Sequence, residues 1–167
     1  MQYFICGGED SISKWILDRE HLVNATRKFL PVLTERGGFV YAEAWAFNEE
    51  KTGLRVYDTF HDDSFTAIAD FEKAARAITL EPGRGAIGRV FEAQKGELLK
   101  DLNFKGRARM NSSKGAGLKS GLVVPVWNES GKEIAAVLHF YSSHTIDPEH
   151  AKIMSDDFTN ISKQMYA

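Results

Sequence analysis

The feature that most constrains the fold of this chain is a glycine-rich turn at residues 81–90 (EPGRGAIGRV). Its three glycines have the GxGxxG spacing of a dinucleotide-binding turn, and Asp101 lies near the distance expected of an acid that binds ribose. A dinucleotide-binding unit, however, needs a tight turn that leads from a strand into a long helix. Pro82 interrupts the turn here, and Gly96 limits the following helix to about residues 86–94. The glycines therefore favour a tight structural turn over a nucleotide site.

Three segments of the chain resemble GAF domains, in the same order and at similar spacing. Residues 78–91 (ITLEPGRGAIGRVF) are similar to the PGxGLxGRVW segment of that family. Residues 117–126 (GLKSGLVVPV) and 133–142 (EIAAVLHFYS) are similar to two later apolar segments. The resemblance extends from about Trp15 to Met165. It implies one domain, with a small-molecule pocket between an antiparallel sheet and the middle segments of the chain.

Length and composition restrict the class of protein. A chain of 167 residues can bury one core and is too short for two ordinary domains, so we expect a flexible lead-in at residues 1–10 and a single domain at 11–167. A net charge of −2 does not indicate a nucleic-acid partner, and the apolar runs are too short to cross a membrane. The single cysteine, Cys6, excludes an internal disulfide and fits a reducing, cytoplasmic location.

The first part of the chain predicts a helix followed by a hairpin. Apolar residues recur at helical spacing over residues 13–33, where Pro31 should kink or shorten the helix before Gly37-Gly38 ends it. Residues 39–47 alternate between a bulky and a small face, which predicts a strand, and residues 54–60 predict its partner. We expect the small face to pack against helices. The bulky face contains Phe39, Tyr41, Glu43, Trp45 and Phe47.

The rest of the chain predicts short helices at residues 62–78 and 86–94, a short strand at 97–102, and a hairpin of strands at 118–127 and 133–142. Asp147 is a good N-cap for a last helix, because Pro148 then occupies its first position. The fold class is therefore α+β, with an antiparallel sheet of about six strands. The terminal helices would cover one face. Short helices and loops would enclose a pocket on the other face, which the resemblance to GAF domains also implies.

Polar side chains on two central strands are candidates for ligand binding. His139 lies inside an apolar strand and shares a face with Val137 and Tyr141. If the face of Glu43 and Trp45 also borders the pocket, each strand places a polar group there, and such groups could orient a ligand. His139 could also be the axial ligand of a haem, since haem-binding GAF domains exist. The alternative is that His139 binds no ligand and is either a core histidine whose hydrogen bonds are made within the protein or a histidine that faces the surface.

A basic stretch borders the same region. Residues 102–128 contain no acid and carry several lysines and arginines, and the resemblance places them at the mouth of the pocket. Their field favours an anionic ligand, such as a carboxylate or phosphate, and arginine suits a bidentate contact. The alternative is a solvated, flexible surface. We expect four ligand contacts from this region and the turn before it: Arg84, Phe104, Arg109 and Met110.

The resemblance also argues against several cofactors and activities. A covalent bilin would need a cysteine, usually followed by histidine, and residues 107–112 (RARMNS) contain neither. Free methionine-R-sulfoxide reductases of the GAF class act through cysteines within the domain, and no cysteine follows Cys6. The Asn-Lys pair and Phe of cyclic-nucleotide GAF domains are absent after residue 142. No histidines have the spacing of a metal pair on one helix.

The prediction is a non-catalytic sensor domain that binds a small molecule and forms a homodimer through its terminal helices. An alternative is a protein-interaction domain whose pocket is filled by its own side chains, among them Trp45, Phe104 and Met110. An enzyme is the third interpretation. No set of catalytic residues is close in sequence, although a distant pair such as Glu43 with His139 stays open.

Overall fold

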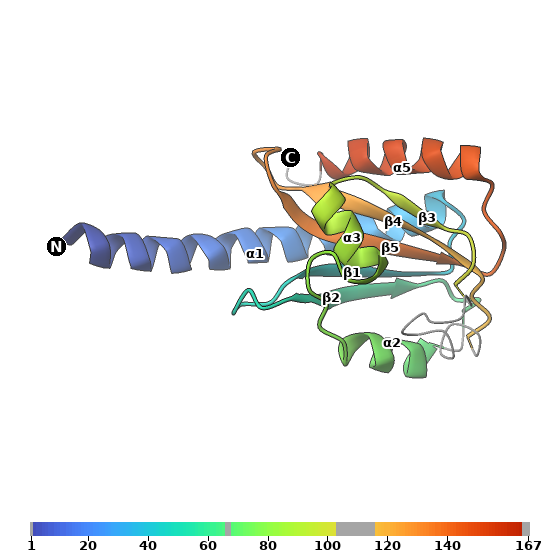
Figure 1. The fold of residues 1–167 in the computed structure, drawn as a ribbon, viewed down its shortest axis with the longest axis horizontal. Helices are drawn as coiled ribbons and strands as arrows, with labels where there is room; N and C mark the ends of the chain where they lie inside the picture. Colours follow the sequence, from blue (N-terminus) through green and yellow to red (C-terminus); the bar gives the residue numbers. More distant parts are fainter. Residues whose placement is uncertain (1, 66–67, 103–115, 165–167) are drawn as a thin grey trace.

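The computed structural model describes residues 2–65, 68–102 and 116–164. These residues form five strands and four helices around an antiparallel sheet, which confirms the α+β prediction (Figure 1). The elements are α1 (Gln2–Arg36), β1 (Tyr41–Phe47), β2 (Leu54–His61), α2 (Ile68–Arg76), α3 (Gly85–Ala93), β3 (Glu97–Leu99), β4 (Ser120–Trp127), β5 (Ile134–Ser142) and α5 (Pro148–Ser162).

The sheet has the strand order β2-β1-β5-β4-β3, so the first and last long strands of the chain are neighbours at its centre. Helices α1 and α5 cover one face, and α2 and α3 lie on the other (Figure 1). About six strands were expected, and the described residues form five, with one further isolated bridge in which Leu80 pairs with Leu54 of β2. The layered arrangement is the one predicted from the order of elements.

The alternation along β1 decides which face of the sheet meets which helices. Ala42, Ala44 and Ala46 are buried in one cluster with residues of α1 and α5. Their small side chains allow the helices to approach the sheet closely. Tyr41 and Trp45 are buried on the opposite face, as predicted. Phe39 departs from the prediction, because it precedes the strand and packs with Phe140 and Phe158 on the side of α5.

Helix α1 is longer than the sequence predicts. It begins at Gln2 instead of residue 13, so residues 2–10 are helical, and its N-terminal half projects beyond the sheet (Figure 1). It also continues past Pro31 to Arg36, where that proline was expected to kink the helix or shorten its end. The helix ends at the predicted glycines, where the Phe39 amide donates to the Thr34 carbonyl at 3.0 Å in the bonding pattern of a Schellman motif.

The glycine-rich turn packs directly against α3. A Cβ atom on Gly88 would lie 2.5 Å from the Glu81 carbonyl oxygen, so only glycine allows this approach without a shift of the backbone. The Gly83 amide also donates to the Gly88 carbonyl at 2.8 Å. All strand pairs in the described residues are antiparallel, and α3 does not connect two parallel strands. The glycines with GxGxxG spacing therefore form a structural turn that is not part of a dinucleotide-binding unit.

Candidate functional site

The sheet face that lies away from α1 and α5 holds a buried carboxyl group, that of Glu43. Its exposed fraction is 0%. Within the described residues, three side chains donate hydrogen bonds to it: the hydroxyl groups of Tyr41 and Tyr141, each at 2.8 Å, and the indole nitrogen of Trp45 at 3.1 Å. These donors replace the hydrogen bonds to water that the carboxyl group loses when it is buried. The arrangement holds Glu43 in one orientation.

Strand geometry brings these side chains together. Tyr41, Glu43 and Trp45 are two residues apart along β1 and therefore share a face. On β5, His139 lies opposite Glu43, and Tyr141 lies opposite Tyr41. Tyr141 is thus a diagonal neighbour of Glu43, a position from which a long side chain can reach. The cluster follows directly from the register between β1 and β5.

His139 is the second buried polar residue on this face. It is 1% exposed, and its ring stacks on Tyr141 with centroids 3.8 Å apart and planes inclined by 19°. A Cβ atom on Gly121 of β4 would lie only 2.8 Å from the His139 Nε2 atom. A haem iron needs open space at the ring nitrogen that ligates it. Because β4 occupies that space, the site does not fit a haem bound through Nε2.

Aromatic side chains from the α2 side cover the tyrosines. Phe71 of α2 meets Tyr41 and Tyr141 nearly edge-on, with centroid distances of 5.3 and 5.1 Å. Phe65 packs against Tyr41 at 5.6 Å. Edge-to-face packing of this kind adds stability beyond the buried area alone. The packing of Phe65 and Phe71 against the two tyrosine rings therefore helps to keep the tyrosine hydroxyls in position to donate to Glu43.

Two described residues on either side of residues 103–115 lie beside this cluster. Leu102 and Leu118 are buried with Tyr41 and Tyr141, and the Leu102 amide donates to the Lys119 carbonyl at 2.8 Å. Residues 103–115 lie outside the described part of the chain. The predicted contacts Phe104, Arg109 and Met110 fall within that range and stay predictions.

Arg84, the remaining predicted contact, occupies the N-cap position of α3 and is exposed. Nearby Arg89 forms an ion pair with Glu97, with a nitrogen–oxygen distance of 2.8 Å. That hydrogen-bonded pair raises the pKa of Arg89. The structure thus brings Glu43, Trp45 and His139 together, while in the described residues Arg84 makes no contact with them.

Sequence reasoning missed the two tyrosine hydroxyls as partners of Glu43. The signal was present, because Tyr41 shares the face of Glu43 and Tyr141 shares the face of His139. What the sequence alone did not fix was the register between β1 and β5, which puts both hydroxyls within reach of one carboxyl group.

Two further kinds of site are not found in the described residues. No group of three or more histidine, cysteine or acidic side chains there could hold a metal ion. No helix within residues 2–65, 68–102 and 116–164 is long and apolar enough to cross a membrane.

Comparison with known proteins supports the fold directly. No family model and no curated protein matches the sequence, but many solved structures resemble this one. The GAF domain region of a protein from Geobacter sulfurreducens PCA has a TM-score of 0.60 and 15% identity, over 89% of this chain and 94% of that one. Free methionine-R-sulfoxide reductase from Neisseria meningitidis, solved with its substrate, has a TM-score of 0.60 and 15% identity, over 87% and 77% of the two chains.

A third similar structure is NreA of Staphylococcus aureus, mutated in its nitrate-binding site. It has a TM-score of 0.57 and 16% identity, over 80% of this chain and 95% of that one. These likenesses show that the chain has a GAF-like fold, in agreement with the resemblance of the three sequence segments. Both an enzyme and a protein with a nitrate-binding site are among the structures of similar fold.

Proposed function

We propose that this chain is a non-catalytic sensor domain that binds a small molecule over the sheet face around Glu43, Trp45 and His139. The observation that carries the proposal is the completely buried Glu43 carboxyl, fixed by three side-chain donors. Ligand sites are mostly apolar and contain a few polar groups held in place, which matches this cluster. The sulfoxide reductase solved with its substrate and the nitrate-binding NreA add support, since both have a similar fold.

The charges near the cluster restrict the ligand. An anionic group is disfavoured directly beside the carboxyl group of Glu43, so we place it away from that residue. Leu102 and Leu118, on either side of residues 103–115, are buried beside the tyrosines, so the basic residues of that segment are the suitable place for it. We therefore keep Arg109, Phe104 and Met110 as proposed contacts of an anionic ligand, together with Arg84 at the outer edge.

Ligand binding on one face of the sheet could change the position of the helices on the other face through β1. Glu43 and Trp45 lie on one face of β1, while Ala42 and Ala44 on its other face pack in the cluster that contains α1 and α5. A small displacement of β1 would therefore be felt by both helices. A ligand shifts such an equilibrium only through its different affinity for the two states.

We also propose that two copies associate through the outer surface of α1 and α5. Val32 of α1 is 54% exposed and Ile153 of α5 is 67% exposed, and no other large apolar residue within 18–65, 69–102 and 116–164 is exposed to this degree. Both residues lie on the helices of one layer, and exposed apolar side chains there favour contact with a partner. The single Cys6 supports a reducing, cytoplasmic location for the protein.

The alternative is a protein-interaction domain whose pocket is filled by its own side chains. The complete burial of Tyr41, Trp45 and Tyr141 favours it, because these large side chains already occupy much of the space over the sheet. An enzyme is less well supported. Glu43 and His139 face each other across two strands, but each contacts Tyr141 and neither borders an exposed nucleophile in the described residues.

The first experiment is an absorption spectrum and a native mass spectrum of the purified protein. A Soret band or a co-purified mass would identify the class of ligand. Thermal unfolding with L-methionine sulfoxide, nitrate and cyclic nucleotides follows. At a ligand concentration of 100 times Kd, the stabilisation is about 2.7 kcal/mol, which corresponds to roughly 5–10 °C for a chain of this length.

The matched variants for this test are Glu43→Gln and Glu49→Gln. Glu49 is an exposed glutamate of the β1–β2 turn and serves as the control. The proposal expects Glu43→Gln to abolish most of the ligand-induced shift, while Glu49→Gln leaves it unchanged. If the native mass is that of the protein alone and no probe raises the unfolding temperature, the protein-interaction domain becomes the better interpretation.

A further inference from the structure

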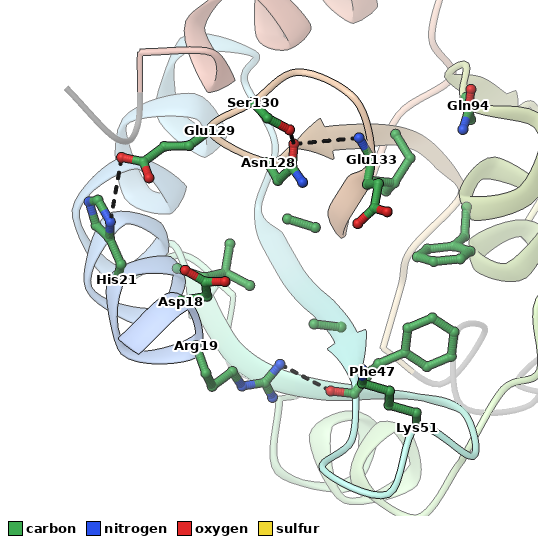
Figure 2. A pocket seen from close by; sticks show the side chains of 15 residues that line it. Asp18, Arg19, His21, Phe47, Lys51, Gln94, Asn128, Glu129, Ser130 and Glu133 are labelled. Atoms are coloured by element: carbon green, nitrogen blue, oxygen red, sulfur yellow. Dashed lines mark hydrogen bonds and ion pairs between the residues drawn. The ribbon is translucent and has the colours of Figure 1, made fainter. Parts of the chain in front are cut away.

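A cavity of about 720 Å³ lies away from the Glu43 cluster, at the end of the sheet where β1 turns into β2 and β4 turns into β5 (Figure 2). Helix α1 forms one wall and the C-terminal end of α3 forms the other. Its volume is in the range of small-molecule sites. None of its lining residues was a predicted contact, because the cavity depends on how two turns and two helices meet.

The floor of the cavity is apolar. Phe47 and Phe91 pack edge-to-face, with centroids 4.9 Å apart and planes inclined by 83°. Ala46 and Ala135, which belong to the cluster packed against α1, also line the cavity with their methyl groups. An aromatic or aliphatic group of a ligand would find both ring faces and methyl groups to pack against.

The rim of the cavity carries three carboxyl groups, those of Asp18, Glu129 and Glu133. Figure 2 shows the side chain of Glu133, the residue just before β5, extending into the space between α1 and α3. Glu129 lies 3.8 Å from the Nδ1 atom of His21, on the outer side of the rim. Asp18 stands on the α1 wall.

The two basic residues of the lining do not balance these acids equally. Arg19 is already engaged, because its guanidinium donates to the Phe47 carbonyl at 3.2 Å and lies 4.8 Å from the centre of the Tyr57 ring. Burial lowers the pKa of this guanidinium. Lys51 is exposed on the β1–β2 turn. A ligand at the centre therefore meets acids on more sides than free cations, which favours a positive group.

We propose that this cavity is a second binding site, for an organic cation with an aromatic or aliphatic body. The body packs on Phe47, Phe91 and Ala135, and the ammonium group lies between Glu133 and Asp18. The site is separate from the Glu43 cluster and does not depend on the function proposed for that cluster.

Two probes with the same ring and opposite charge test this proposal: 2-phenylethylamine and phenylacetate. Each is titrated into the ¹⁵N-labelled protein up to millimolar concentration, and amide shifts are followed by NMR. We expect the amine to shift the amides of residues 46–51, 91–94 and 128–135, with at least fivefold weaker binding of phenylacetate. Shifts at Tyr41, His139 and Tyr141 would instead report the Glu43 cluster, so the two sites are told apart in one experiment.

Three variants complete the test. Glu133→Gln and Asp18→Asn should each weaken binding of the amine about threefold or more, whereas Glu49→Gln, an exposed acid on the neighbouring turn, should not. Ala135→Leu should prevent binding of either probe by filling the floor, and the two charge variants decide the matter if that variant does not fold. Equal binding of both probes, or an unchanged affinity in both Glu133→Gln and Asp18→Asn, overturns the proposal.

Discussion

Glu43 of β1 lies directly opposite His139 of β5, and Tyr141 contacts both of them. The Tyr141 hydroxyl donates to the Glu43 carboxyl at 2.8 Å, while its ring stacks on the imidazole of His139 at 3.8 Å. All three side chains are almost completely buried. A change at either polar residue is therefore transmitted to the other through one aromatic side chain, at the centre of the sheet.

Replacing Glu43 by alanine should destabilise the protein strongly. The substitution removes the carboxyl group that accepts hydrogen bonds from the buried hydroxyls of Tyr41 and Tyr141 and from the indole N–H of Trp45. Each buried group left unsatisfied costs about 1–3 kcal/mol, so we expect a total loss of about 3 kcal/mol or more. Urea unfolding followed by tryptophan fluorescence measures it.

Glu43→Gln should cost less, about 1 kcal/mol. Among the described residues, Tyr41 is the donor to the Oε2 atom, and its hydroxyl can rotate to accept a bond from an amide NH₂ placed there. The Oε1 position keeps an oxygen for Tyr141 and Trp45. Equal destabilisation by glutamine and alanine would contradict this account of the hydrogen bonds.

Gly121→Ala should destabilise the protein by about 1–3 kcal/mol through crowding. The new methyl group would lie 2.8 Å from the His139 Nε2 atom and 3.0 Å from the Phe140 carbonyl oxygen. In the double variant with His139→Ala, the first of these contacts disappears. A double-mutant cycle in urea should therefore give a combined loss smaller than the sum of the single losses. Strict additivity would show that the imidazole is not what Gly121 accommodates.

The layers of the fold could be predicted from the sequence because the side chains of a strand alternate between the two faces of the sheet with a fixed period of two residues. Along β1, alanines at positions 42, 44 and 46 indicated a face packed by helices, and the structure buries them with α1 and α5. The same period placed Glu43 and Trp45 together on the other face. On β5 it placed His139 with Tyr141, and these two rings stack.

The rest depended on contacts between segments that are far apart in sequence. The partners of Glu43 follow from the register of β1 with β5, and the cavity between α1 and α3 follows from the position of two turns. Phe39 was assigned to the wrong face, because the chain changes direction after Gly38 and the strand begins only at Tyr41. The start of α1 was placed too late, since Gly7 and Gly8 do not interrupt the helix.

Charges placed on the outer surface of α1 and α5 should weaken the proposed dimer. Val32→Lys and Ile153→Lys each replace an exposed apolar side chain by a cation. The wild-type protein is expected to sediment as a dimer, and the double variant as a monomer with an unchanged circular-dichroism spectrum. Ala77→Lys is the control, because it adds the same charge just after α2 on the opposite side of the sheet. Monomeric wild-type protein, or dissociation by the control variant as well, would remove the support for this interface.

The turn between β2 and α2 should make stability depend on acid pH. Asp62 accepts the Ser64 amide at 2.8 Å, and this hydrogen bond lowers the pKa of Asp62 below its ordinary value of 3.8. A carboxyl group with a lowered pKa in the folded state contributes stability that is complete above its unfolded pKa. That contribution is lost as the pH falls from about 3.8 through the lower folded value, because the unfolded chain takes up the proton first.

Asp62→Asn can keep the hydrogen bond to Ser64 but cannot titrate, so its loss of stability below pH 3.8 should be smaller than that of the wild type. Unfolding free energies in urea, measured from neutral pH down through this range, give the comparison. Asp63→Asn is the matched control, because the neighbouring carboxyl group does not accept the Ser64 amide. The turn also carries Phe65, which packs on Tyr41, so acid should perturb the Glu43 cluster from this side. If Asp62→Asn and Asp63→Asn changed the acid limb equally, the hydrogen bond to Ser64 would not be the cause.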